Sequence, residues 1–171
     1  MKKHSGMRPH DIAILLKIST FRDANWYAKD LALHIKISAS EVSESLERSV
    51  IAGLISNDKK TLMKSALLEF LEFGLRYVYP VIPGSITRGV LTAHSAPPLV
   101  NFIQGNEPYV WPYANGNARG QSIEPLHPKL PEACLNDKDL YELLALTDAL
   151  RIGRIREKQI AVEELKKRIL I

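Results

Sequence analysis

Two arginine–glycine pairs, Arg88-Gly89 and Arg119-Gly120, are the residues of this chain best suited to holding a small anion. A guanidinium can donate two parallel hydrogen bonds to a carboxylate or phosphate, and the glycine beside it leaves the backbone flexible. Together with His94, Arg88 and Arg119 form a candidate anion site. The alternative, which we favour, is that both arginines hydrogen-bond to backbone carbonyl groups of the irregular segment that contains them.

The histidines offer no recognisable metal-binding pattern. They are His4, His10, His34, His94 and His127, and none are paired as HxH or HxxxH. No acidic residue stands at the spacing of a metal site, so we expect neither a metal nor another cofactor. A glycine-rich phosphate loop, a nucleophile elbow and a catalytic pair of carboxylates are also missing from the sequence. We therefore expect that the protein is not an enzyme.

Cys134 is the only cysteine, which excludes an internal disulfide bond and a cysteine-based zinc site. It precedes a predicted helix, and a helix N-terminus can lower the pKa of a thiol and make it reactive. Because the sequence shows no partner for catalysis, we interpret Cys134 as a small buried apolar side chain.

Composition places the chain among ordinary globular proteins, with 171 residues, 46% hydrophobic residues and 25% charged residues. A net charge of +4 is compatible with nucleic-acid binding but does not require it. No apolar run approaches the roughly 20 residues of a membrane helix, and the N-terminus lacks a signal-peptide pattern. We expect a cytoplasmic protein with no membrane partner.

Proline usage divides the chain into three regions. Residues 1–78 contain one proline and strong helical patterns, residues 79–135 contain the other nine prolines, and residues 136–171 contain none. The middle region also carries many apolar side chains, so we expect an ordered, irregular wrap over the helices. Its alternating Tyr109, Trp111 and Tyr113 predict a short strand with three rings on one face. Those rings either form a binding platform for a partner or, as we favour, pack on the helices.

The first region predicts several helices in succession. Pro9 suits the first turn of one helix. A second begins near Trp26 or Tyr27 with Asn25 as its cap. For the third, Ser38 is the expected N-cap, Glu41 completes a capping box, and Gly53 is a left-handed stop.

Residues 54–62 then predict two very short strands around a turn, which is a minimal wing. A long helix follows over residues 63–77. Its apolar side chains cover a wide arc of the helix surface, so we expect the helix to be buried on two sides or to lie at a subunit interface. The last region predicts a helix capped by Asn136 or Asp137, a break at Gly153 and a second helix. These two helices form either a hairpin or a dimer contact.

The apolar pattern of residues 9–62 matches a known DNA-binding domain. The matching positions are Ala28, Leu31, Ala32, Ile37, Ser38, Val42, Leu46 and Ala52–Ile55. This third of the chain resembles the winged helix-turn-helix of bacterial transcriptional regulators of the MarR and ArsR type. The resemblance implies a mainly α fold in which the third helix enters the DNA major groove. The remainder of the chain resembles no family of known activity.

If the resemblance holds, double-stranded DNA is the main partner, and the expected contacts follow from the positions of polar residues on the motif. The residues expected to contact base edges are Ser38, Ser40, Glu41, Ser43 and Glu44. The residues expected to contact phosphates are Arg48, Lys36, Lys59 and Lys60, with further contacts from Lys29 and Arg22. We expect a homodimer, because two copies can engage two half-sites together.

One feature favours a different use of the same domain. Glu41, Glu44 and Glu47 make the third helix acidic, whereas a helix that enters the groove of a polyanion is usually more basic. The alternative is a non-catalytic adaptor or antitoxin-like protein, in which the winged helix or the proline-rich segment binds a protein partner. The sequence predicts a DNA-binding regulator and leaves this alternative open.

Overall fold

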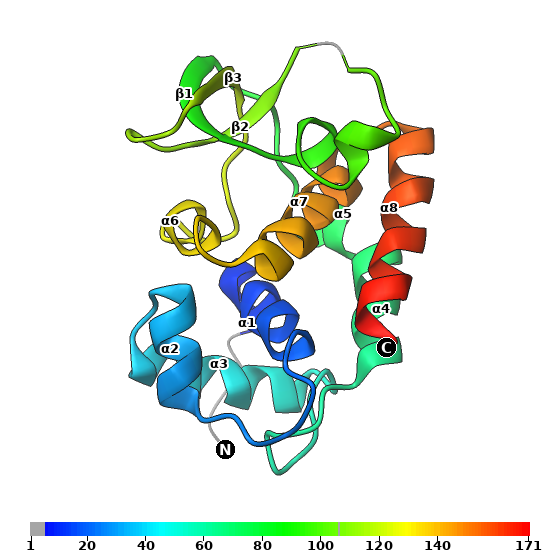
Figure 1. The fold of residues 1–171 in the computed structure, drawn as a ribbon. Coiled ribbons are helices and arrows are strands. Elements are labelled where there is room, and N and C mark those ends of the chain that lie inside the picture. The colour runs from blue at the N-terminus through cyan, green and yellow to red at the C-terminus, as the bar shows by residue number, and fades with distance from the viewer. Residues whose placement is uncertain (1–5, 106) are drawn as a thin grey trace.

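A computed structural model describes residues 6–105 and 107–171 of the chain, and most of these residues are helical (Figure 1). The helices are α1 (Pro9–Ser19), α2 (Ala28–Ile35), α3 (Ala39–Ile51), α4 (Lys64–Phe73), α5 (Leu75–Val78), α6 (Leu130–Cys134), α7 (Lys138–Ile152) and α8 (Ile155–Ile169). Between α5 and α6 lie the strands β1 (Ile86–Leu91), β2 (Tyr109–Pro112) and β3 (Ala118–Ser122), with short 3-10 turns η1 (Ala93–Ser95) and η2 (Leu99–Asn101). The expectation of a mainly helical protein is confirmed.

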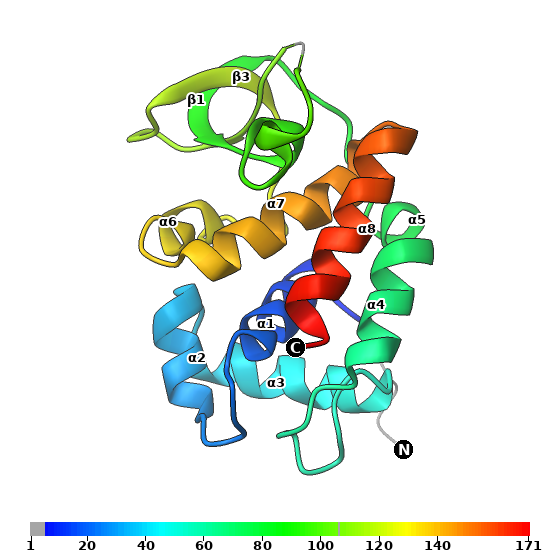
Figure 2. The same cartoon turned by 45° about the vertical axis from the view of Figure 1, so that its right-hand side comes forward.

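Two helices carry the centre of the core. All side chains of residues 11–18 in α1 and of residues 143–150 in α7 are buried, and the two helices contact each other. The ammonium group of Lys17 in α1 lies 2.6 Å from a carboxylate oxygen of Asp137, which is the N-cap of α7. One continuous apolar cluster therefore joins the first and last regions of the sequence. Figure 2 shows α8 beside both α7 and α4 on the other flank of this core.

The segment from α2 to α3 folds much as its capping residues predict. The hydroxyl of Ser38 accepts a hydrogen bond from the backbone N–H of Glu41, and Lys36 makes the left-handed turn that ends α2. At the end of α3, Gly53 has a φ of +76° and the N–H of Leu54 donates to the carbonyl of Ser49. This is the hydrogen-bond pattern of a Schellman stop, which glycine favours because it has no Cβ.

Two helix boundaries in this region differ from the prediction. The second helix begins at Ala28 with Tyr27 at the N-cap position, so Asn25 does not cap it. The helix expected over residues 63–77 is divided at Gly74 into α4 and α5. Between α3 and α4, Ile55 and Leu62 form a single antiparallel bridge, as expected for two very short paired segments.

The middle region contains a small sheet, so the prediction of an irregular wrap is wrong for the strands Ile86–Leu91 and Ala118–Ser122. β1 pairs antiparallel with β2 and β3, and β2 pairs parallel with β3, which closes the three strands on one another. Glycine permits this closure, because a Cβ on Gly89 would lie 1.9 Å from the carbonyl oxygen of Trp111. A Cβ on Gly120 would likewise lie 2.3 Å from the carbonyl oxygen of Pro108. The glycines after Arg88 and Arg119 therefore serve backbone packing.

The aromatic residues of β2 face the helices. Trp111 is buried and its ring meets that of Tyr141 on α7 edge to face, with 5.8 Å between centroids. Tyr109 lies on the same strand and Tyr113 directly follows its end, so the short strand that these alternating residues predict is confirmed. The interpretation that these rings pack on helices is confirmed for Trp111.

A buried ion pair on α7 attaches the sheet to the helices. One carboxylate oxygen of Asp148 accepts hydrogen bonds from the Thr92 hydroxyl (2.7 Å) and from Nε1 of Trp111 (2.6 Å). The other accepts from the Arg151 guanidinium at 2.9 Å. Arg151 also donates to the backbone carbonyls of Tyr79 and Glu124, at the entry to and exit from the sheet region. Burial raises the pKa of Asp148, whereas the charge of Arg151 and the hydrogen bonds from Thr92, Arg151 and Trp111 favour its ionised form.

We predict that Asp148→Asn destabilises the protein by about 3–5 kcal/mol, because it leaves the buried guanidinium of Arg151 without its counter-charge. Urea unfolding at neutral pH measures this change. The control is Glu163→Gln, an exposed residue on α8. Equal stability of the two variants would contradict a structural role for the Asp148–Arg151 pair.

Candidate functional site

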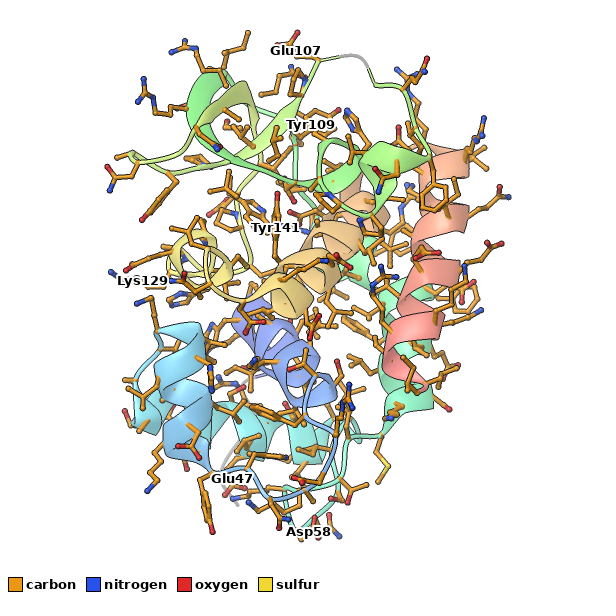
Figure 3. The ribbon with its side chains drawn as sticks, in the orientation of Figure 1. Glu47, Asp58, Glu107, Tyr109, Lys129 and Tyr141 are labelled. Atoms are coloured by element: carbon orange, nitrogen blue, oxygen red, sulfur yellow. The ribbon has the colours of Figure 1, made fainter. Side chains whose placement is uncertain are left out.

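The outward face of α3 is the surface that the sequence analysis assigns to DNA. The inner face of this helix packs on α1 and α2 through Val42 and Leu46, which are buried. The opposite face is exposed and is made of Ser40, Ser43, Glu44 and Glu47, with Ser38 at the N-cap. α3 thus presents hydroxyl and carboxylate groups to solvent. Figure 3 shows Glu47 and Asp58, which follows α3 in the hairpin, at the same end of the molecule.

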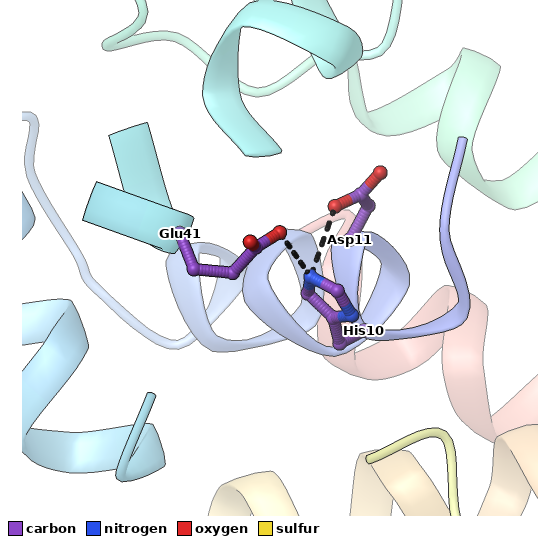
Figure 4. Close-up of side chains that lie close together, drawn as sticks. All are labelled: His10, Asp11 and Glu41. Atoms are coloured by element: carbon purple, nitrogen blue, oxygen red, sulfur yellow. Dashed lines mark hydrogen bonds and ion pairs between the residues drawn. The ribbon is translucent and has the colours of Figure 1, made fainter. Parts of the chain in front are cut away.

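A polar cluster beneath the first turns of α3 fixes this helix on α1. Nε and Nη2 of Arg48 each lie 2.8 Å from a carboxylate oxygen of Asp11, and Nη2 lies 2.7 Å from Glu41. Nε2 of His10 is 2.7 Å from the same Glu41 oxygen (Figure 4). Arg8 completes the set from the chain before α1, at 3.3 Å from Glu41.

This cluster corrects two sequence predictions. The guanidinium of Arg48 is buried against Asp11 and Glu41, so the prediction that Arg48 contacts a DNA phosphate is wrong. Glu41 was expected to close a capping box and to read a base, but its carboxylate faces Arg48, His10 and Arg8 instead. Residues 31 to 38 positions apart in the sequence meet here, and helical periodicity alone does not reveal such pairs.

The charges of the cluster stabilise each other. Partial burial raises the pKa of Glu41, but hydrogen bonds and charge from Arg48 and His10 outweigh burial and lower it to about 2. The bidentate hydrogen bond to Asp11 raises the pKa of Arg48 above its usual value, against the effect of burial. Both groups are therefore ionised at neutral pH, and α3 is held on α1 by charge-assisted hydrogen bonds.

His10, Asp11 and Glu41 lie close enough together to share a metal ion, and sequence spacing did not suggest this. Arg48, however, donates to both Asp11 oxygens and to the Glu41 oxygen that also meets His10. A cation at this point would have to displace a guanidinium that already neutralises the carboxylates. The arrangement therefore suits a structural ion cluster better than a metal centre.

The lysines assigned to phosphate contacts differ in how their ammonium groups interact with the rest of the protein. Lys36 is exposed and its ammonium lies 3.3 Å from Glu132, while the ammonium of Lys59 in the hairpin pairs with Glu47 on α3. Lys60 instead donates to the backbone carbonyl of Trp26 and lies 4.6 Å from the centre of that ring. Lys60 therefore attaches the hairpin to the segment before α2, and its contact with DNA stays a prediction.

The candidate anion site of Arg88, Arg119 and His94 is not assembled as expected. Arg88 and Arg119 are exposed partners directly opposite each other on β1 and β3. His94 is buried on η1, against Tyr109, and the pocket that it lines includes neither arginine. The two arginines are thus together, but the histidine belongs to a different site.

Cys134 is a buried thiol at the end of α6. Burial, followed by the charges of Asp137 and Asp148, raises the pKa of this thiol well above its usual value. A thiol with a raised pKa is a poor nucleophile at neutral pH. This confirms the interpretation of Cys134 as a small buried side chain.

Comparison with known proteins gives no relative from which a role could be transferred: no protein-family model, no curated protein and no solved structure matches the chain. Among the described residues, no helix has both the length and the apolar character needed to cross a membrane.

We predict that the Glu41 cluster makes the protein sensitive to acid. The folded-state pKa of about 2 lies below the usual 4.5, so Glu41 stabilises the fold above pH 4.5 and loses that effect as pH falls toward 2. Allowing for its partial exposure, we expect Glu41→Gln to cost about 1–2 kcal/mol at pH 6 and much less at pH 2.5.

Urea unfolding at the two pH values tests this prediction, with the exposed Glu69 on α4 as the control in Glu69→Gln. A Glu41→Gln effect of the same size at both pH values would contradict the assigned role of its charge.

Proposed function

We propose that the protein is a sequence-specific DNA-binding transcriptional regulator and that residues 9–62 act as a winged helix-turn-helix. One observation carries the proposal: α3 follows α2 through a tight turn, precedes a short hairpin, and exposes Ser40, Ser43 and Glu44 on its outward face, where Lys59 of the hairpin pairs with Glu47. Helix-turn-helix proteins bind DNA by placing such an uncovered second helix in the major groove.

In this proposal the N-terminal half of α3 recognises the bases. Ser38, Ser40 and Ser43 present hydroxyl groups that can donate to or accept from several base edges, and Glu44 can accept from the amino group of cytosine. The serines are small, so they allow the helix backbone to approach the base pairs. We assign specificity to these four residues.

Phosphate contacts come from lysines around α3. Lys29 and Lys36 are exposed at the two ends of α2, and Lys59 lies in the hairpin. The ion pairs of Lys36 with Glu132 and of Lys59 with Glu47 lie near the surface, where such pairs contribute at most about 1 kcal/mol. Exchanging these carboxylates for DNA phosphates therefore costs little.

The carboxylates on α3 shape the expected binding mode. Glu44 and Glu47 repel the phosphate backbone, which weakens binding to DNA of arbitrary sequence. A base pair that donates a hydrogen bond to Glu44 offsets part of this repulsion, whereas other base pairs do not. Repulsion of this kind raises specificity at the expense of affinity.

We predict that Lys59→Ala weakens binding to all DNA sequences and lowers the slope of log affinity against log salt by about 0.9, because one phosphate contact is lost. Lys138, exposed on α7, provides the matched control Lys138→Ala. Fluorescence anisotropy with DNA from upstream of the protein's own gene and a scrambled duplex, over a salt series, measures both quantities.

Ser43→Ala should instead reduce the preference for the native duplex and leave the salt slope unchanged. No binding of the wild-type protein to either duplex at low salt would refute the DNA-binding proposal.

The homodimer remains part of this proposal, with its contact on α4 and α5. Phe73 and Tyr77 are 66% and 73% exposed beside a groove of about 460 Å³ between these helices and α8. Two copies joined there would present two α3 helices to two half-sites, which raises affinity by linkage.

We predict that Phe73→Glu lowers the sedimentation-derived mass from that of a dimer to that of a monomer, because a charge is placed in an apolar contact. Ile82→Glu, at a position 87% exposed outside the groove, is the control. Dissociation by the control variant alone, or an unchanged dimer with Phe73→Glu, would contradict this interface.

A protein partner is the second candidate, favoured by apolar side chains beside the acidic helix. Leu33 on α2 is 78% exposed and Ile51 on α3 is 66% exposed, and neither suits contact with a charged DNA backbone. Co-purification of a stoichiometric protein that is lost with Leu33→Ser, combined with no DNA binding, would support this adaptor role.

A further inference from the structure

A second candidate site lies at the opposite end of the molecule from α3. It is a pocket of about 430 Å³ between η1, the segment that leads into β2, and the start of α8. Its lining includes His94, Glu107, Tyr109, Arg154, Arg156 and Glu157. In Figure 3, Glu107 and Tyr109 lie far from Glu47 and Asp58 at the α3 end. A volume of this size falls within the range of small-molecule sites.

His94 in this pocket is a buried polar group without a hydrogen bond. The residue is 7% exposed, and neither Nδ1 nor Nε2 has a partner among the described residues. The imidazole ring of His94 meets the ring of Tyr109 edge to face, with 4.8 Å between centroids. The preceding residue, Ala93, has a φ of +52°. A neutral imidazole has one donor and one acceptor to satisfy, and leaving them unpaired destabilises the fold. An unpaired buried polar group lowers the stability of the fold, and such groups are typical of functional sites.

Gly105 explains how His94 is covered in the free protein. A Cβ on Gly105 would lie 2.7 Å from Cδ2 and 3.0 Å from Nε2 of the imidazole, so the glycine backbone packs directly on the ring. A ligand that hydrogen-bonds to Nε2 must therefore move Gly105 off the ring. Because the ring nitrogens have no partner in the free state, that new bond replaces no existing one.

The pocket lining carries two arginines and two glutamates, and the arginines are placed to hold an anion. Arg154 and Arg156 are exposed at the N-terminus of α8, and neither guanidinium has an ion-pair partner among the described residues. Glu157 accepts a hydrogen bond from the backbone N–H of Arg154, so its carboxylate is engaged in capping the helix. Glu107, the other acid, is exposed on the segment before β2. The two free guanidinium groups and the positive end of the helix dipole attract an oxyanion.

We propose that this pocket binds a small molecule that carries a carboxylate or phosphate group. Arg154 and Arg156 hold the oxyanion at the start of α8, and a polar group of the ligand hydrogen-bonds to His94. The site is separate from α3, so ligand binding here stands independently of the proposed DNA-binding function. For a regulator, such a ligand has the role of an effector.

The imidazole signals of ¹⁵N-histidine-labelled protein test the proposal by NMR. Sodium phosphate and sodium succinate are the two probes, each titrated against sodium chloride at equal ionic strength. We expect a saturable shift of the His94 signal, identified by its absence in His94→Gln, with at least one probe and none with chloride. Response to phosphate alone assigns a phosphorylated ligand, and response to succinate assigns a carboxylate.

Two double variants separate the pocket from general surface charge. Arg154→Gln with Arg156→Gln should weaken probe binding at least tenfold, while Arg88→Gln with Arg119→Gln, on the exposed sheet face, should leave it unchanged. No saturable shift with either probe, or equal loss in both double variants, would overturn the proposal.

His94→Leu supplies a measurement that does not depend on choosing the right ligand. Removing two unpaired polar atoms from a buried position should raise Tm by about 2–4 °C. The same variant should lose the rise in Tm that the bound probe gives to the wild-type protein. A lower Tm for His94→Leu would show that His94 has a structural partner and would contradict a ligand-binding role.

Discussion

The ion pair between Asp148 and Arg151 is the constraint on which the arrangement of the middle region depends. Four hydrogen bonds from this pair reach Thr92, Trp111 and the carbonyls of Tyr79 and Glu124, which lie in separate parts of the chain. A three-stranded sheet with strands of four to six residues buries little apolar surface of its own. Its attachment to α7 through satisfied, buried charges therefore fixes where η1, and with it His94, is placed relative to the start of α8.

The N-terminal helices use the same kind of interaction. Arg48 and Asp11 form a buried bidentate pair that fixes α3 on α1, as Asp148 and Arg151 fix the sheet on α7. Such pairs add little net stability compared with apolar packing, but they penalise every arrangement in which one partner is left alone. A helix held this way keeps its outward face in one orientation, which a surface that recognises DNA or a protein requires.

Local signals predicted the parts of the fold that depend on neighbouring residues. Ser38, Gly53 and Asp137 act on backbone groups within a few positions, so the ends of α3 and the start of α7 could be predicted from sequence. The sheet could not, because its register joins Arg88 to Arg119 across 31 positions and its strands are interrupted by proline and glycine. The partners of Arg48 and the burial of His94 were missed for the same reason, since both are set by tertiary contacts.

Part of the positive charge of the molecule is neutralised inside it. Lys17, Arg48 and Arg151 neutralise internal carboxylates, so the net charge of +4 says little about the surface. At the α3 end Lys36 pairs with Glu132 and Lys59 pairs with Glu47, so the DNA recognition proposed there would depend on hydrogen bonding more than on overall attraction. Arg88 and Arg119 on the sheet and Arg154 and Arg156 at the start of α8 have no ion-pair partner among the described residues, and the same holds for Arg22 before α2 and Arg76 on α5. The proposed anion pocket therefore lies at the opposite end of the molecule from α3, which separates it in space from the proposed DNA-binding surface.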